Sequence, residues 1–202
     1  YDARISAVSA AGVQVSVTGQ IDPDTESPVA ITIAQGFLKE KKMDELIRPL
    51  TELGISRWIP FIAERSVARP DALRLPARKA RWEKIAAESL KQCRRSRVPE
   101  IGEVLTFGGM LDAAAGQDLK ILFWEKASSP KRDLFSLAGG EPCETVFAVL
   151  GPEGGLSEEE VAAAREAGFV IATLGPRILR AETATVAATA LLQYFLGDLG
   201  KN

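Results

Sequence analysis

Two glycine–proline turns carry the residues of this chain that could do chemistry. The first spans 151–155, with the sequence GPEGG, and the second spans 175–180, with the sequence GPRILR. Each turn follows an apolar run and precedes a helical pattern, so each is expected where a buried strand passes into a helix. Glycines at such a place let a ligand approach the backbone, and peptide N–H groups at the next helix start attract polar or anionic atoms. The pattern favours a nucleotide-like ligand.

The first turn differs from the phosphate-binding loops that glycine-rich sequences usually form. Its glycine spacing is not that of the dinucleotide fingerprint, and Glu153 stands where a pyrophosphate would be repelled. A downstream acid for the ribose is also lacking, which disfavours a dinucleotide-binding oxidoreductase. Ser157 and Glu160 have the spacing of a helix capping box, and we assign both residues to structure.

The second turn brings Arg177, Arg180 and Glu182 together at a strand end. Taken alone, a structural salt bridge between Arg180 and Glu182 explains this turn as well as a functional role does. Two polar turns at one sheet edge favour function. The helix that follows, 181–196, is rich in Ala and Thr. It is therefore either tightly buried or packed against a partner subunit, and from the residues alone we favour burial.

Strands and helices alternate along the chain and must position the two turns. The alternation predicts an α/β domain with a parallel sheet and helices on both faces. Parallel strands end at a common edge, so both turns should open there, where ligands bind in open α/β folds. Pro49 should kink the first helix and Gly54 should end it. The expected strands are 30–34, 58–62, 120–124, 146–150 and 169–174, and the expected helices are 39–53, 78–95, 107–115, 157 onward and 181–196.

A small β module is expected ahead of this domain. Residues 3–8 and 13–17 alternate apolar and polar side chains around Ala11-Gly12, which is the pattern of a β-hairpin. The chain begins at Tyr1 inside the first of these strands, and we expect an N-terminal portion to precede it. The predicted organisation is a β module over 1–22, a linker rich in turn formers over 23–29, and the main domain over 30–202.

Composition and charge exclude several classes of site. The chain has 202 residues, a net charge of −2 and no histidine, so any contact with nucleic acid must come from a local patch. Cys93 and Cys143 are fifty positions apart, which excludes a zinc-type ligand set, and a histidine base is excluded as well. We expect no metal. No apolar run approaches membrane-spanning length, and a reduced, cytoplasmic protein fits best.

A basic stretch precedes the two turns. From Arg65 through Arg97 there are eleven Lys or Arg residues against three Asp or Glu. On charge alone, a solvated helix face explains this stretch better than a binding surface does. The sequence Arg94-Arg95-Ser96-Arg97 favours the alternative, because guanidinium groups at a helix end suit bidentate phosphate contacts.

The two turns and several upstream segments resemble a known family, the RsmE-type 16S ribosomal RNA uridine-N3 methyltransferases of the SPOUT (α/β-knot) superfamily. The resemblance depends mainly on 150–155 (LGPEGG) and on 174–180 (LGPRILR) followed by Glu182-Thr183-Ala184, and it covers nearly the whole chain. Upstream segments agree in order: Lys42-Met43, 52–55, Pro60, 64–66, Gln92, Arg95, Val98 and Pro99. Pro49 and Arg94 depart from the family pattern, outside these motifs.

The resemblance implies a SPOUT-type trefoil-knotted parallel sheet, preceded by the remnant of a PUA-like β-barrel, and a homodimer. It also implies an S-adenosylmethionine pocket built from three loops. The glycine turn with Glu153 suits this cofactor, which carries a sulfonium cation and no phosphate. The residues implied to bind it are Phe123, Glu125, Leu150, Gly151, Pro152, Glu153, Gly154, Gly155, Leu174, Gly175, Arg177, Ile178, Leu179 and Thr183.

The implied reaction is methylation of N3 of a uridine in 16S ribosomal RNA of the small ribosomal subunit. Arg180 would stabilise negative charge on the oxygens beside N3, and Glu182 would accept the N3 proton. An alternative is a non-catalytic RNA-binding or ribosome-assembly factor that keeps the fold, although such a protein need not keep the cofactor motifs. RNA contacts are expected from Arg65, Arg69, Arg94, Arg95 and Arg97.

Overall fold

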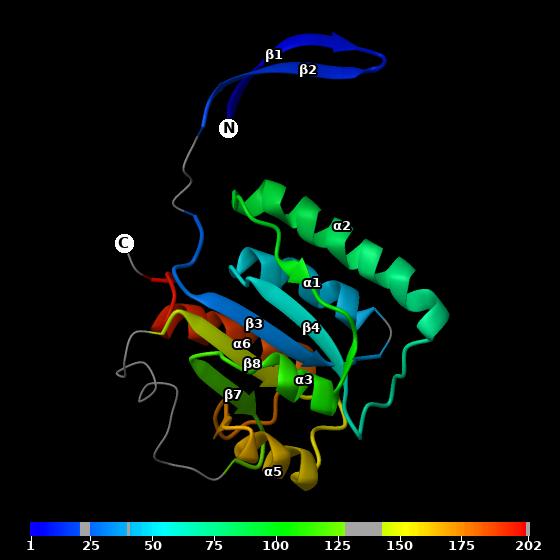
Figure 1. The fold of residues 1–202 in the computed structure, drawn as a ribbon, viewed down its shortest axis with the longest axis vertical. Coiled ribbons are helices and arrows are strands. Elements are labelled where there is room, and N and C mark those ends of the chain that lie inside the picture. The colour runs from blue at the N-terminus through cyan, green and yellow to red at the C-terminus, as the bar shows by residue number, and fades with distance from the viewer. Residues whose placement is uncertain (21–24, 40, 128–142, 201–202) are drawn as a thin grey trace.

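A seven-stranded parallel β-sheet organises the chain from Ala30 onward (Figure 1). The structure, a computed structural model, describes residues 1–20, 25–39, 41–127 and 143–200. The strand order is β5-β4-β3-β8-β7-β9, with β6 beside β4. The predicted parallel sheet is therefore confirmed. Its strands are β3 (Ala30–Gly36), β4 (Arg57–Ile62), β5 (Glu100–Ile101), β6 (Leu105–Thr106), β7 (Leu119–Phe123), β8 (Thr145–Leu150) and β9 (Val170–Ala172).

The position of β8 decides where a ligand can enter. This strand lies between β3, which is more than a hundred residues earlier in the chain, and β7. Its last residue, Leu150, pairs with Gln35 on one side and with Phe123 on the other. The carboxyl ends of β3, β8 and β7 therefore lie side by side at one edge of the sheet. This edge lies beside the point where the strand order reverses, which is the usual ligand site of an open α/β sheet.

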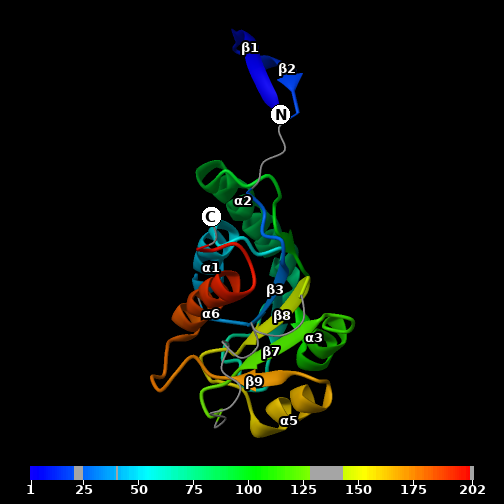
Figure 2. The same cartoon turned by 90° about the vertical axis from the view of Figure 1, so that its left-hand side faces the viewer.

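Helices cover both faces of the sheet, as predicted (Figure 2). Along β8, Val146 and Ala148 face one core and Phe147 and Val149 face the other, because successive strand residues point to opposite faces. The first core is closed by α1 (Lys42–Glu52), α2 (Leu75–Cys93) and α6 (Ala181–Phe195), and the second by α3 (Phe107–Ala113) and α5 (Glu158–Glu166). A short 3-10 turn, Ala72–Arg74, precedes α2.

The ends of the helices follow their sequence signals. In α5, the Ser157 side chain accepts a hydrogen bond from the Glu160 N–H while the Glu160 carboxylate accepts one from the Ser157 N–H, so the predicted capping box is confirmed. Helix α1 runs through Pro49 to Glu52, and Gly54 follows with φ +79°; a kink at Pro49 stays a prediction.

Helix α6 is buried along only one side. Thr185, Ala188 and Leu192 are buried, whereas Tyr194 is 56% exposed. The alanines at 184, 187 and 190 are half-buried. Burial within the chain therefore explains one stripe of this Ala-rich helix and leaves a second stripe accessible.

The predicted N-terminal hairpin is confirmed by an antiparallel pair, β1 (Asp2–Ser9) and β2 (Gly12–Gly19). Every residue of both strands is exposed. Of the predicted linker, residues 23 and 24 lie outside the described residues, and Thr25 and Ser27 bond to the main domain. The Thr25 hydroxyl donates to the Arg94 carbonyl oxygen at 3.2 Å, and the Ser27 hydroxyl donates to Gln193 Oε1 at 2.9 Å.

Two further findings on the described residues concern membrane-spanning helices and metal-binding groups. None of their helices combines the length and the apolar character that a bilayer crossing requires. Among the same residues, no group of three or more His, Cys, Asp or Glu side chains could hold a metal ion.

Candidate functional site

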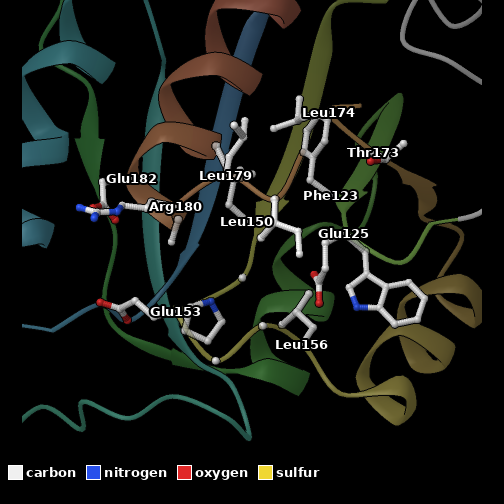
Figure 3. Close-up of a pocket in the computed structure, with 18 of the residues that line it drawn as sticks. Phe123, Glu125, Leu150, Glu153, Leu156, Thr173, Leu174, Leu179, Arg180 and Glu182 are labelled. Atoms are coloured by element: carbon white, nitrogen blue, oxygen red, sulfur yellow. The ribbon is translucent and has the colours of Figure 1, made fainter. Parts of the chain in front are cut away.

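A pocket of about 500 Å³ opens at the carboxyl ends of β7, β8 and β9 (Figure 3). Its volume lies in the range of small-molecule sites, roughly 300–1,000 Å³. Three loops form it: the one after β7, the one after β8, and the one that joins β9 to α6. The structure thus brings together at one edge the segments in which the sequence placed its candidate residues. Those that line the pocket are Phe123, Glu125, Leu150, Gly151, Pro152, Glu153, Gly154, Gly155, Leu174, Arg177, Ile178, Leu179, Arg180 and Glu182.

Two of the residues predicted to bind the cofactor lie outside the pocket lining, and six lining residues were not predicted. Gly175 and Thr183 belong to the same segments but do not line the pocket. Most of the residues that were not predicted lie next to, or between, predicted residues in the chain. Their position within the motif segments was the signal that could have indicated them. Lys42 comes from α1, more than eighty residues before the nearest predicted cofactor residue, and the only signal for it was that Lys42-Met43 matches the family pattern. The missed residues are Lys42, Trp124, Leu156, Thr173, Ala181 and Ala184.

The loop after β8 is held against β3 by backbone contact. A Cβ added to Gly36 would lie 2.5 Å from the Pro152 nitrogen and 2.8 Å from the Gly151 carbonyl carbon, so the two main chains touch. Buried Gln35 donates to the carbonyl oxygens of Gly36 at 3.0 Å and Gly151 at 3.2 Å. Its own oxygen accepts a hydrogen bond from the Thr185 hydroxyl of α6. This hydrogen-bond network fixes the start of the loop against β3, and Thr185 of α6 orients the Gln35 side chain that does so.

The glycines at the end of the same loop are required by close approach as well. A Cβ on Gly154 would overlap the Arg65 carbonyl oxygen. Gly155 has φ +71°, a left-handed conformation that favours glycine, and a Cβ there would lie 3.3 Å from Glu125 Oε1. The sequence pattern predicts the approach of a ligand as the reason for these glycines; in the structure, the close approach of Arg65 and Glu125 already requires glycine at both positions, and ligand approach stays a prediction.

A lysine bridges two acids that come from different chain segments of the pocket. Lys42 Nζ lies 3.2 Å from Glu153 Oε1 and 3.4 Å from Glu182 Oε2. Burial raises the pKa of Glu153, but hydrogen bonds from the Lys39 and Glu153 N–H groups and from Lys42 outweigh it and hold that pKa below its usual value. The hydrogen bond to Glu153 and the charge of Glu182 raise the pKa of Lys42.

The arginines of the second turn remain available to a ligand. The salt bridge considered between Arg180 and Glu182 is absent from the ion pairs of the described residues, where Glu182 pairs with Lys42. Arg177 and Arg180 are both exposed and line the pocket. In Figure 3, Arg180, Glu182 and Glu153 gather at one side of the pocket and Glu125 lies at the other. A cation with no partner beside a pocket is suited to stabilising charge on a bound molecule.

Four of the five arginines proposed for RNA contacts are exposed: Arg65, Arg69, Arg94 and Arg97. The assignment of Arg95 is wrong, because its side chain is only 5% exposed. It donates to the Glu26 carboxylate at 2.7 and 3.2 Å and to the Thr51 carbonyl oxygen at 2.8 Å. Arg94, which ends α2 in the left-handed conformation with φ 60°, precedes this inward-facing side chain.

The Glu26 carboxylate also accepts hydrogen bonds from the backbone N–H groups of Ser96 at 2.8 Å and Arg97 at 3.0 Å.

Replacing Glu26 by Gln is therefore expected to destabilise the protein by about 1–3 kcal/mol at pH 7, because hydrogen bonds to a charged group are lost. Burial raises the pKa of Glu26, but its hydrogen bonds with Arg95, Ser96 and Arg97 lower it below the ordinary 4.5. A lowered folded-state pKa gives stability that is present above pH 4.5 and is lost as pH falls through the folded pKa.

Urea denaturation of both proteins between pH 7 and pH 3.5 measures this effect. The difference in unfolding free energy between wild type and Glu26→Gln should shrink as the pH falls below 4.5. Glu88→Gln is the matched control, since Glu88 pairs with Lys91 on the surface, and it should change stability less. A difference that stays constant with pH would show that the Glu26 charge does not hold this contact.

Comparison with known proteins agrees with this geometry. Residues 25–193 match the family described as the RNA methyltransferase domain. Ribosomal RNA small subunit methyltransferase E of Bacillus subtilis (strain 168) is 34% identical over 95% of this chain and 76% of its own length. The Synechocystis protein of the same name is 33% identical over 87% of this chain, which here spans 57% of the relative.

A solved structure is similar over nearly the whole chain. The crystal structure of ribosomal RNA small subunit methyltransferase E from Neisseria gonorrhoeae, bound to S-adenosyl methionine, superposes with a TM-score of 0.86 at 30% identity. The similarity covers 97% of this chain and 78% of that one. The matched span, the identity and the shared fold agree, and the chain belongs to the RNA methyltransferase domain family, in which its relatives are the ribosomal RNA small subunit methyltransferase E proteins.

Proposed function

We propose that this protein transfers a methyl group from S-adenosylmethionine to N3 of a uridine in 16S ribosomal RNA of the small ribosomal subunit. The observation that carries the proposal is the pocket itself. Three chain segments converge on it from the carboxyl ends of β7, β8 and β9, and they place Arg180 and Glu182 on the same lining. The names of the relatives support methylation of small-subunit ribosomal RNA, and the uridine and its N3 atom are part of the proposal.

The residues of the pocket fit the proposed cofactor. Its walls include Leu150, Leu174 and Leu179, which suit a flat, uncharged ring. The indole nitrogen of Trp124 is buried without a hydrogen-bond partner among the described residues, so it offers a donor to a ligand. When bound, S-adenosylmethionine supplies an activated methyl group on a sulfonium cation. The residues proposed to hold it are those predicted from the sequence, with Trp124 added and with Gly175 and Thr183 acting through the shape of their segment.

The chain's own residues would then favour the reaction at the uridine. N3 must lose its proton as the methyl group arrives, and negative charge spreads to the neighbouring carbonyl oxygens. The exposed guanidinium of Arg180 supplies a donor for this charge. Glu182 is the proposed acceptor of the proton, and Lys42, whose Nζ lies 3.4 Å from its Oε2, helps to hold Glu182 in place. The loops hold the two reactants in line, and such positioning is itself a large part of catalysis.

RNA would approach over exposed arginines and the N-terminal hairpin. Arg65, Arg69, Arg94 and Arg97 are proposed to contact the RNA backbone. The target base must leave its stack to enter the pocket. Val13, Val15 and Val17 of β2 are between 52% and 61% exposed, and apolar side chains on a strand are normally covered within a larger β module. We therefore propose residues 1–22 as part of a PUA-like barrel, followed by the linker 23–29.

The trefoil knot and the homodimer are proposed on related grounds. The Gln35 side chain of β3 bonds both to Gly151 in the loop after β8 and to Thr185 of α6, and this close association of three distant chain segments supports a knot. Ile178 is 85% exposed beside the pocket, and the half-buried alanines of α6 leave room for another backbone. A second subunit on this face would cover both. Its ribosomal substrate would place the protein in the cytoplasm.

A gene deletion tests the substrate assignment. N3-methyluridine should be missing from 16S ribosomal RNA of a deletion strain, and it should return when the gene is restored. Mass spectrometry of the isolated nucleosides measures both. Persistence of the modified base in the deletion strain would refute the substrate.

Calorimetry of the wild-type protein with S-adenosylmethionine separates the enzyme from a non-catalytic RNA-binding or ribosome-assembly factor. The enzyme must bind the cofactor, whereas the factor need not. If the protein binds RNA and shows no heat with S-adenosylmethionine, the second function replaces the first.

A further inference from the structure

Lys42 lies where three separate parts of the fold meet. It is the first residue of α1, Glu153 belongs to the loop after β8, and Glu182 belongs to the first turn of α6. The sheet order puts β3, which leads into α1, beside β8, and α1 packs on α6 in the same core. The lysine is thus placed by topology between two acids from far later in the chain.

The contacts of this cluster are partly withdrawn from water. The side chains of Lys42, Glu153 and Glu182 are 31%, 22% and 27% exposed, so their attraction is screened less than that of a fully exposed pair. Glu153 Oε1 also accepts the Lys39 N–H at 3.1 Å. Glu182 Oε2 is buried and makes no hydrogen bond, and in the described part of the chain Lys42 is the cation within ion-pair distance of it.

All three residues line the pocket, so the cluster has a chemical consequence as well as a structural one. One positive and two negative side chains leave a single net negative charge on this cluster, which lies at the same side of the pocket as the guanidinium of Arg180 (Figure 3). The proposed methyl donor carries a sulfonium cation, and the product, S-adenosylhomocysteine, carries a neutral thioether in its place. The charge of this cluster therefore bears on how the pocket distinguishes donor from product.

We propose that Lys42 is a positioning residue that ties the cofactor loop to the catalytic turn and limits the net negative charge of its cluster with Glu153 and Glu182 to one. The inference depends on the proposed function, since it assigns Lys42 a task toward that donor and that reaction. With Lys42 in place, Glu153 and Glu182 keep a fixed separation and Arg180 stays where the turn presents it. Without it, the two acids repel each other, and the loop and the turn move apart.

Replacing Lys42 by Met tests both parts of the proposal. The rate constant kcat for methylation should fall by about tenfold or more, since a displaced catalytic turn costs rate, while KM for the RNA stays within about twofold. The affinity for S-adenosylmethionine relative to S-adenosylhomocysteine, measured by calorimetry on the protein alone, should rise about threefold or more, because Glu153 and Glu182 then leave two negative charges in the cluster instead of one. Lys42→Arg keeps the charge and can bridge two carboxylates, and it should restore both values.

Lys41→Met is the matched control. Lys41 is exposed, it directly precedes Lys42, and no ion pair of the described residues includes it. Its replacement removes the same charge from the same end of α1 and should leave kcat and the affinity ratio unchanged.

The outcomes separate the inference from the function on which it depends. A wild type that binds neither ligand overturns the proposed function and the inference with it. If the wild type binds both and methylates RNA but Lys42→Met behaves like Lys41→Met, the inference alone is overturned. A fall in kcat with an unchanged affinity ratio and no rescue by Lys42→Arg also overturns it, since it assigns Lys42 to folding only.

Discussion

Arg180→Ala is expected to lower the rate of ribosomal RNA methylation by about 10²–10³-fold, the usual cost of losing one donor that stabilises developing charge. The side chain is exposed at the pocket, and its main chain rather than its guanidinium starts α6, since the Arg180 carbonyl oxygen accepts the Ala184 N–H at 2.8 Å. The fold should therefore survive. Methylation is measured with isolated small subunits from the deletion strain, and folding by thermal unfolding.

Two further variants make this prediction sharp. Arg165→Ala removes an exposed arginine from the last turn of α5 and should leave the rate unchanged. Arg180→Lys keeps the charge but not the planar fork, and it should recover only part of the rate. The structural salt bridge considered from the sequence predicts the reverse for Arg180→Ala, namely a loss of stability with little specific loss of rate.

Gly36→Ala is expected to weaken S-adenosylmethionine binding at least tenfold and to destabilise the protein by roughly 1–3 kcal/mol. The added methyl group would lie 2.5 Å from the Pro152 nitrogen and 2.6 Å from its Cδ. Pro152 follows the end of β8, so the cofactor loop must move before the methyl group fits. Calorimetry measures the binding, and urea denaturation measures the stability.

Gly108→Ala is the matched control for this change. Gly108 lies in α3, and an added Cβ meets no atom within 4 Å. Since alanine favours a helix over glycine by up to about 1 kcal/mol, stability should stay equal or rise, and binding should not change. Wild-type affinity in Gly36→Ala would mean that the loop after β8 does not form the cofactor site.

The sequence predicted the sheet well because its strands are long enough to show a pattern. The run that ends at Leu150 and the run that starts at Ala30 are buried on both faces, and their apolar residues stand out. Strands β5 and β6 have two residues each, too few for a period, and were missed. Their pairing with β4 depends on contacts that no local pattern records.

The sequence predicted the parts of the site that lie within one short motif, and it missed the contacts between residues that are far apart in the chain. The glycine turns are easy to recognise in the sequence, because few other residues can adopt the backbone conformations or allow the close backbone contacts that such turns require. The role of Arg95 was misread because an arginine that binds phosphate and one that binds Glu26 look the same in sequence. Likewise, the sequence places Arg180 close to Glu182 in the chain, but it does not indicate that Lys42 is the ion-pair partner of Glu182 in the folded protein.

The contact between Gly36 and the loop after β8 has a consequence for how this sequence can evolve. A side chain that becomes too large is often tolerated once a neighbouring side chain becomes smaller. At Gly36 the neighbours are the Gly151 carbonyl carbon and the Pro152 ring and nitrogen, and the two backbone atoms cannot be made smaller by any substitution. Position 36 can therefore drift only together with a change in the length or path of the loop, so glycine there and the loop after β8 should be inherited as one unit.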